Sequence, residues 1–134
     1  MSAARLLYFR LNDQVSALGG RISPDIRRAG SELPVAVYEL QQDAMLEVLG
    51  SPTPRLSVAR CRIHILADSL DEANTIAQTA VDALHAQTWT VSGFTAHMCV
   101  VVNSAQGVID EALPDAHDLP REVVIDIDLT HSTT

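Results

Sequence analysis

Residues 59–84 read ARCRIHILADSLDEANTIAQTAVDAL, and they predict a strand that is followed directly by a helix. Its first nine residues alternate, with small or apolar side chains at odd positions and Arg60, Arg62 and His64 among the even positions. A period of two predicts a strand with one buried face and one polar face. Half-buried strands of this kind are typical of antiparallel sheets.

A helix is predicted directly after this strand. The residues SLDE at 69–72 match a capping box, in which the Ser69 hydroxyl accepts a hydrogen bond from the Glu72 amide. Asp71 and Glu72 also suit the positive end of the helix dipole. The apolar residues beyond the cap recur at helical spacing, so this helix must lie on a sheet or on another helix. The stripe consists of Ala73, Ile76, Ala77, Ala80, Val81 and Leu84.

The rest of the chain predicts one further helix and three further strands. Residues 2–18 have a helical apolar face and stop at two glycines, whereas the segment that follows carries turn residues and is expected to be a loop as far as Leu33. Residues 41–50 favour helix but end abruptly at Gly50, so a helical turn over the core and a projecting arm both stay open. The remaining strands are expected at 35–40, 94–102 and 122–130. Along 94–102 the expected alternation sets Phe94, Ala96, Met98, Val100 and Val102 against Thr95, His97, Cys99 and Val101.

Two connections complete this pattern. The residues TWTVSGF at 88–94 suggest a short strand, a turn at Ser92 and Gly93, and re-entry into the strand at 94–102. Residues 103–120 contain glycine, prolines and acids and are expected to form a long exposed loop. The order of elements is therefore α-β-β-α-β-β. We expect one α+β domain over 1–134, with a four-stranded, mainly antiparallel sheet and two helices packed on one face.

Composition narrows the class of protein. The chain has 134 residues, of which 47% are hydrophobic, which favours a folded core over disorder. Its 9 basic residues, all arginine, stand against 17 acidic ones, and a formal charge of -8 argues against a general grip on nucleic acid. Cys61 and Cys99 lie in apolar runs and are expected to be buried thiols. We see no signal sequence or membrane span and expect a soluble chain made in the cytosol.

No catalytic, cofactor-binding or metal-binding pattern is present in the sequence. TVSGF is not the nucleophile elbow GxSxG, and no glycine-rich phosphate loop follows a strand. The five histidines lack metal-ligand spacing. Carboxylates that are adjacent in sequence point in different directions on a helix or a strand. We therefore expect no catalytic residue, no cofactor and no metal.

Charged residues of opposite sign do recur on two predicted strands. Arg60 and Arg62 share one face of their strand, and Asp126 and Asp128 share one face of the last strand. If the two strands are neighbours, these side chains will pair across the ladder. We favour this structural interpretation over a catalytic use, since no nucleophile or base accompanies the arginines. A subunit or channel surface is the other open interpretation.

The order of four motifs resembles the bacteriophage tail-terminator or tail-completion family of long-tailed phages. A helix ends in GGRISP at 19–24, a Leu-Pro-led strand LPVAVYEL follows at 33–40, the strand and acidic helix of 59–84 come next, and REVVIDIDLTH closes the pattern at 121–131. The resemblance covers nearly the whole chain.

This resemblance implies a structural virion protein that forms a hexameric ring at the head-proximal end of the tail. Such a ring terminates polymerisation of the tail tube and performs head-tail joining. The implied partners are further copies of the chain, the major tail tube protein and the head-tail connector or stopper protein. DNA passes through the lumen without specific binding, and no membrane is involved. The implied location is the virion, after assembly in the host cytoplasm.

The contacts of such a ring are expected in the segments 41–55 and 103–120 and on the charged strand faces. The candidate interface residues are Met45, Leu46, Val48, Leu49, Arg60, Arg62, Asp110, Glu111, Asp126 and Asp128. Three alternatives stay open: another head-tail joining or minor tail protein, a small cytosolic binding module of ferredoxin-like type, and an enzyme.

Overall fold

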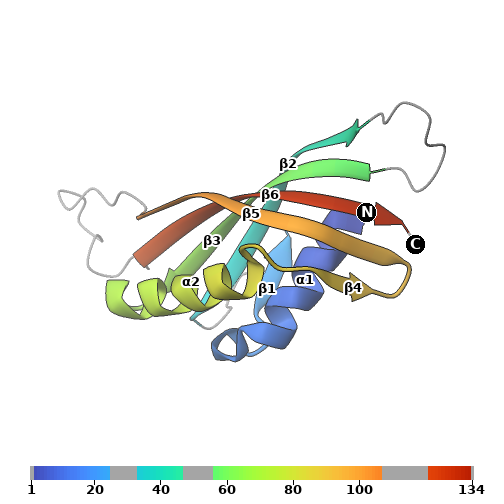
Figure 1. Cartoon of the computed structure of the whole chain (residues 1–134). Coiled ribbons are helices and arrows are strands. Elements are labelled where there is room, and N and C mark those ends of the chain that lie inside the picture. Colours follow the sequence, from blue (N-terminus) through green and yellow to red (C-terminus); the bar gives the residue numbers. More distant parts are fainter. Residues whose placement is uncertain (1, 25–32, 47–55, 107–120, 134) are drawn as a thin grey trace.

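The computed structural model describes residues 2–24, 33–46, 56–106 and 121–133. These residues form a curled sheet with helices along one of its faces (Figure 1). The described helices are α1 (Ser2–Gln14), the 3-10 turn η1 (Ser16–Leu18) and α2 (Leu70–Leu84), and the described strands are β1 (Ile22–Pro24), β2 (Val35–Leu46), β3 (Leu56–Ala67), β4 (Trp89–Val91), β5 (Phe94–Gln106) and β6 (Arg121–Thr133).

The sheet has six strands in the order β1-β2-β3-β6-β5-β4, so the prediction of a four-stranded sheet with the order α-β-β-α-β-β is wrong. The four expected strands do form the centre of the sheet and are antiparallel to their neighbours, as β2, β3, β6 and β5. The predicted order left out two three-residue edge strands: β4 matches the short strand suggested within 88–94, whereas β1 was not expected. The first, β1, runs parallel to β2, which makes the sheet mixed.

Both edge strands are too short to show a period of two. β1 lies in the stretch predicted as a loop, and long-range pairing holds it there, including a hydrogen bond of 2.9 Å from the Ala36 amide to the Arg21 carbonyl. β4 forms a hairpin with β5 through Ser92 and Gly93, the predicted turn, where Gly93 has a φ of 83°. Glycine adopts such a positive φ without steric cost.

Two central strands are longer than the sequence predicts. β2 continues through 41–46, where pairing with β3 from Gln42 opposite Arg60 to Leu46 opposite Leu56 overrides the helical propensity. The alternative of a helical turn is therefore wrong for these residues. β5 continues as far as Gln106, in the part predicted as a loop. The remainder of both predicted segments, 47–50 and 107–120, lies outside the described residues.

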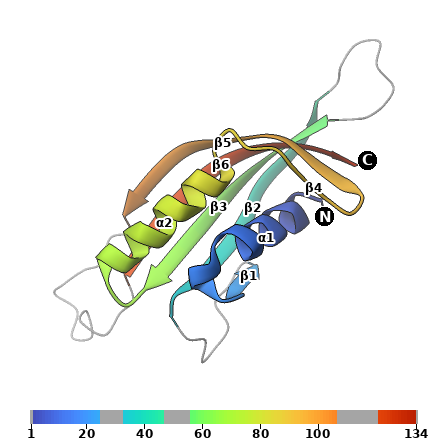
Figure 2. The same cartoon turned by 60° about the horizontal axis from the view of Figure 1, so that its bottom comes forward.

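The core lies between the concave face of the sheet and the two helices. Figure 2 shows α1 and α2 lying side by side across that face. Alternate residues of β3 and β6 point toward the helices and are buried, as the sequence predicts, and the predicted face of α1 is buried with them. The cap of α2 also forms, because the Ser69 hydroxyl accepts from the Glu72 amide at 3.1 Å. The largest buried side chains include Leu6, Leu7, Leu11, Ile63, Ile65, Leu84, Ile125, Ile127 and Leu129.

The expected alternation along 94–102 is wrong beyond Ala96. A β-bulge between Ala96 and Met98 places one extra residue in β5, and a second bulge lies between Val101 and Asn103. One extra residue exchanges the two faces of a strand. Met98 is consequently 56% exposed, and Cys99 is completely buried in its place.

Candidate interaction surfaces

The convex face of the sheet carries a ladder of ionic pairs. In the described part of the chain both helices lie on the opposite face, which leaves this one bare (Figure 2). Arg60 lies opposite Asp128 and Arg62 opposite Asp126 in the pairing of β3 with β6. The Arg60 Nε donates to Asp128 Oδ1 at 2.9 Å, and the Arg62 Nε donates to Asp126 Oδ1 at 2.8 Å. The cross-strand pairing that the sequence predicts is therefore confirmed.

Each arginine also makes a second, longer contact with its carboxylate. Nη2 of Arg60 lies 3.2 Å from Asp128 Oδ2, and Nη2 of Arg62 lies 3.5 Å from Asp126 Oδ2. The hydrogen bond from Arg62 holds the pKa of Asp126 below its ordinary value, although burial acts in the opposite direction. The same kind of bond, to Asp128, raises the pKa of Arg60. Two-point pairing of this kind fixes the planes of both groups.

A histidine continues the ladder toward β2. The Nε2 of His64 lies 3.4 Å from Glu39 Oε1, and its Nδ1 lies 3.5 Å from Glu122 Oε1. The ladder thus contains four carboxylates and two guanidinium groups, so it carries a net charge of -2 while His64 is neutral. The excess negative charge of these groups attracts cationic partners and repels anionic ones. Within the described ranges no three His, Cys, Asp or Glu side chains gather as a metal site.

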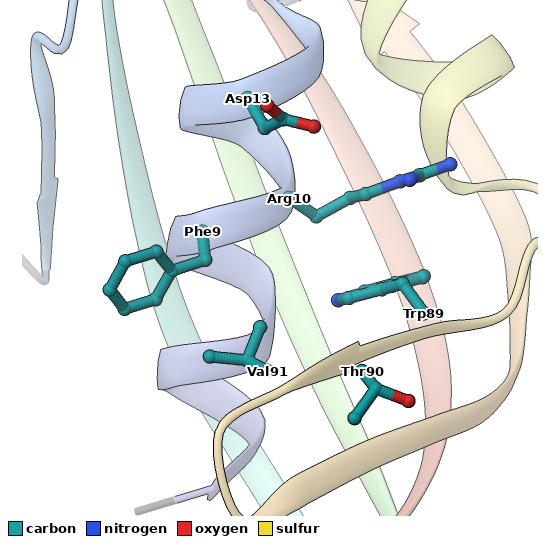
Figure 3. Close-up of a pocket in the computed structure, with 6 residues that line it drawn as sticks. All are labelled: Phe9, Arg10, Asp13, Trp89, Thr90 and Val91. Carbon is teal, nitrogen blue, oxygen red and sulfur yellow. The ribbon is translucent and has the colours of Figure 1, made fainter.

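A groove between α1 and β4 is the second surface feature (Figure 3). It has a volume of about 380 Å³. The Arg10 guanidinium lies over the Trp89 ring at 5.2 Å from its centroid and donates from Nε to the Ala83 carbonyl at 2.8 Å. The Trp89 indole donates to the Leu6 carbonyl at 3.0 Å. These hydrogen bonds connect α1 with α2 and with β4. The groove therefore lies where the three elements pack together, beside the exposed Phe9. Its lining residues are Phe9, Arg10, Asp13, Trp89, Thr90 and Val91.

A buried histidine joins strands that are not neighbours. His131 of β6 is 3% exposed, and its Nε2 lies 3.1 Å from Asp43 Oδ1 of β2, with β3 between the two strands. A second histidine, His97, lies in the first bulge of β5 and contacts the Ser132 hydroxyl at 2.6 Å. Sequence reasoning missed these pairs and the Arg10–Trp89 stack, because their members share no spacing along the chain.

The predicted interface residues divide into three groups. The structure brings Arg60, Arg62, Asp126 and Asp128 together on the convex face. Met45 and Leu46 end β2, where the backbone pairs with Ser57 and Leu56 of β3, away from that cluster. The others lie outside the described residues: Val48, Leu49, Asp110 and Glu111.

The described residues form an open sheet with both helices on one face and paired charges on the other. The chain belongs to the family of the tail completion protein gp17, whose model matches residues 7–130. The resemblance seen in the sequence is thereby confirmed. The protein is a structural component of a phage tail, and its location is the virion. In the described part of the chain, no helix has both the length and the apolar character needed to cross a membrane.

Solved structures support the fold. A chain in the virion of a native gene transfer agent particle superposes with a TM-score of 0.62 at 15% identity, over 94% of this chain and 91% of that one. PylSc, a pyrrolysyl tRNA synthetase of Desulfitobacterium hafniense, superposes with a TM-score of only 0.31 at 13% identity, over 74% of this chain and 39% of that one. The second likeness is too distant to inform the assignment. No curated protein sequence matches.

Proposed function

We propose that the chain forms a hexameric ring at the head-proximal end of the tail. There the ring stops polymerisation of the tail tube and joins the tail to the head connector. The observation that carries this proposal is the match to the tail completion family over residues 7–130, nearly the entire chain. The partners are other copies of the chain, the major tail tube protein and the connector or stopper protein.

Charge supports the passage of DNA through such a ring. The whole chain has a formal charge of -8, and the ladder on the bare face leaves two negative charges unbalanced. Both described arginines of the ladder are already paired with carboxylates, so neither offers a free cation to a phosphate. A surface with negative charge in excess repels the phosphate backbone and lets DNA slide without specific binding.

Substitutions in the predicted subunit interface should prevent ring formation without unfolding the chain. The variant Met45→Asp with Leu49→Asp should stay folded and fail to form rings, because two added charges in an interface core disfavour burial. A matched control, Asn74→Asp with Thr79→Asp, adds the same charge on the exposed face of α2 and should assemble normally.

Light scattering after size-exclusion chromatography and negative-stain electron microscopy measure assembly, with the chain alone and with purified tail tubes. Closed rings, free or on one end of the tubes, are the expected result. A chain that stays a monomer and binds neither end of the tubes would contradict the proposed function.

A further inference from the structure

Among the described residues, no strand lies beside the outer side of β2 over most of its length. β1 pairs with β2 only from Ala36 to Tyr38. From Glu39 to Leu46, the described residues that pair with β2 all belong to β3. Gln41, Gln42 and Asp43 are exposed along this stretch. No described strand uses the backbone amides and carbonyls on the outer side of β2 along this stretch, which is the arrangement that another strand can extend.

The far side of the sheet also lacks a neighbouring strand at its opposite end, within the part of the chain that the structure describes. β4 covers β5 only from Phe94 to Ala96. Further along, the Ala86 amide donates to the Cys99 carbonyl at 2.8 Å, and the Val101 amide donates to His85 Nδ1 at 3.1 Å. Beyond these two bonds, residues 103–106 pair within the described chain with β6 alone, and Val102 lies in the second bulge.

This open end of β5 lacks the usual protection of a strand edge. Folded proteins blunt their edges with lysine, proline or inward-pointing charges. The sequence VNSAQ at 102–106 contains no charged residue and no proline, and Val102 is 49% exposed. Asn103, Ser104 and Ala105 are exposed too. An uncharged, exposed edge is a template for pairing with another chain.

We propose that the end of β5 in one copy pairs with the outer edge of β2 in the next copy, so that the sheet continues from subunit to subunit. The inference rests on the ring described under Proposed function and identifies its contact. Three successive antiparallel pairings, β2 with β3, β3 with β6 and β6 with β5, make β5 antiparallel to β2. The new pair of strands is therefore antiparallel and continues the alternation of strand direction in the sheet.

The two edges differ, which selects a head-to-tail contact. Each copy supplies one edge of each kind, and repeated contacts between unlike edges close into a ring when the rotation allows it. A contact of β2 with a second β2 would set two edges that each carry Glu39 and Asp43 against each other, and like charges on neighbouring strands are destabilising. The uncharged end of β5 imposes no such repulsion.

The register follows in part from the bulges. β2 has its bulge between Leu40 and Gln42, and β5 has its second bulge between Val101 and Asn103, so regular pairing begins after these residues. Gln42 lies opposite Arg60 and thus shares the convex face. Asn103 and Ala105 share that face as well, since they lie opposite Asp126 and Val124, whereas Ser104 belongs to the concave face.

Disulfide cross-linking of the full chain tests this arrangement. Gln42→Cys is combined in turn with Asn103→Cys, Ala105→Cys and Ser104→Cys, and assembled rings are oxidised. Cysteines opposite each other on one face of an antiparallel pair have the Cα separation that a disulfide needs. We expect covalent multimers on a non-reducing gel from the Asn103 or the Ala105 combination. The Ser104 combination is the control and should remain uncross-linked, as should each single variant.

Hydrogen exchange gives a second readout that does not depend on register. Assembly should slow the exchange of amides in 39–46 and in 102–106 by at least about tenfold relative to the monomer, because edge amides gain partners. Rings that form without this protection and without cross-links would overturn the inference and leave the proposed function intact. A chain that forms no ring, alone or on tail tubes, would contradict both the strand pairing and the proposed function.

Discussion

The first bulge of β5 makes a quantitative prediction, because it exchanges the faces of two adjacent residues. Met98 is 56% exposed, so Met98→Asp should change the free energy of unfolding by no more than about 0.5 kcal/mol. Cys99 is fully buried among the core residues of the concave face. Cys99→Asp should lower the free energy of unfolding by about 3–5 kcal/mol, because it leaves a carboxylate buried and unpaired. That loss is large against the total of about 5–15 kcal/mol expected for a domain.

Urea denaturation followed by fluorescence measures both variants. Trp89 is the single tryptophan, and it lies in β4 and packs against α1, so its emission should change on unfolding. The two variants introduce the same side chain at neighbouring positions, and each serves as the control for the other. Regular alternation from Phe94 would place Met98 in the core and Cys99 outside it. An equal or greater loss in Met98→Asp would therefore refute the bulge and the register of β5.

Three further predictions concern the core and its titrating groups. Ile76→Asp should unfold the domain, because Ile76 is 3% exposed in the face of α2 that packs on the sheet; a native circular dichroism spectrum and a cooperative melt would contradict the assigned core. The pKa of Asp126 is held low by the Arg62 hydrogen bond, so this pair contributes stability above the unfolded carboxyl pKa of about 3.9 and loses it as the pH falls through the lower folded value. Asp126→Asn should flatten the decline of the urea midpoint in that acidic range, and an unchanged decline would count against the pair. Burial raises the pKa of Cys61 and of Cys99 to about 12, so neither thiol should react with iodoacetamide at pH 8 until urea unfolds the chain. Rapid labelling of the folded protein, followed by mass spectrometry, would show that one of these thiols is exposed.

The long periodic segments were predictable because their own side chains specify the buried face. The strand and helix of 59–84 and the closing strand match their predicted elements, and the Arg60–Asp128 and Arg62–Asp126 pairs follow from the same alternation. Opposite charges on two strands can form ion pairs only when those strands are neighbours. The strand order makes β3 and β6 neighbours.

The strand β1, the extension of β2 and the bulges of β5 were not predictable, because pairing with other strands determines them. Three residues of β1 acquire their structure from β2, and the extension of β2 through 41–46 comes from β3. A bulge adds one residue without any signal in the sequence, so the alternation of β5 was misread at Met98. Arg10 and Trp89 are 79 positions apart in the sequence, and only the packing of α1 beside β4 brings them together.

Cryo-electron microscopy of intact tailed particles would locate this chain and reveal its contacts with neighbouring copies. The predicted result is a closed ring of this chain at the head-proximal end of the tail, with the end of β5 in each copy seated along β2 of the next. Density for the chain elsewhere in the particle, or as isolated copies without contacts between their sheets, would contradict the account.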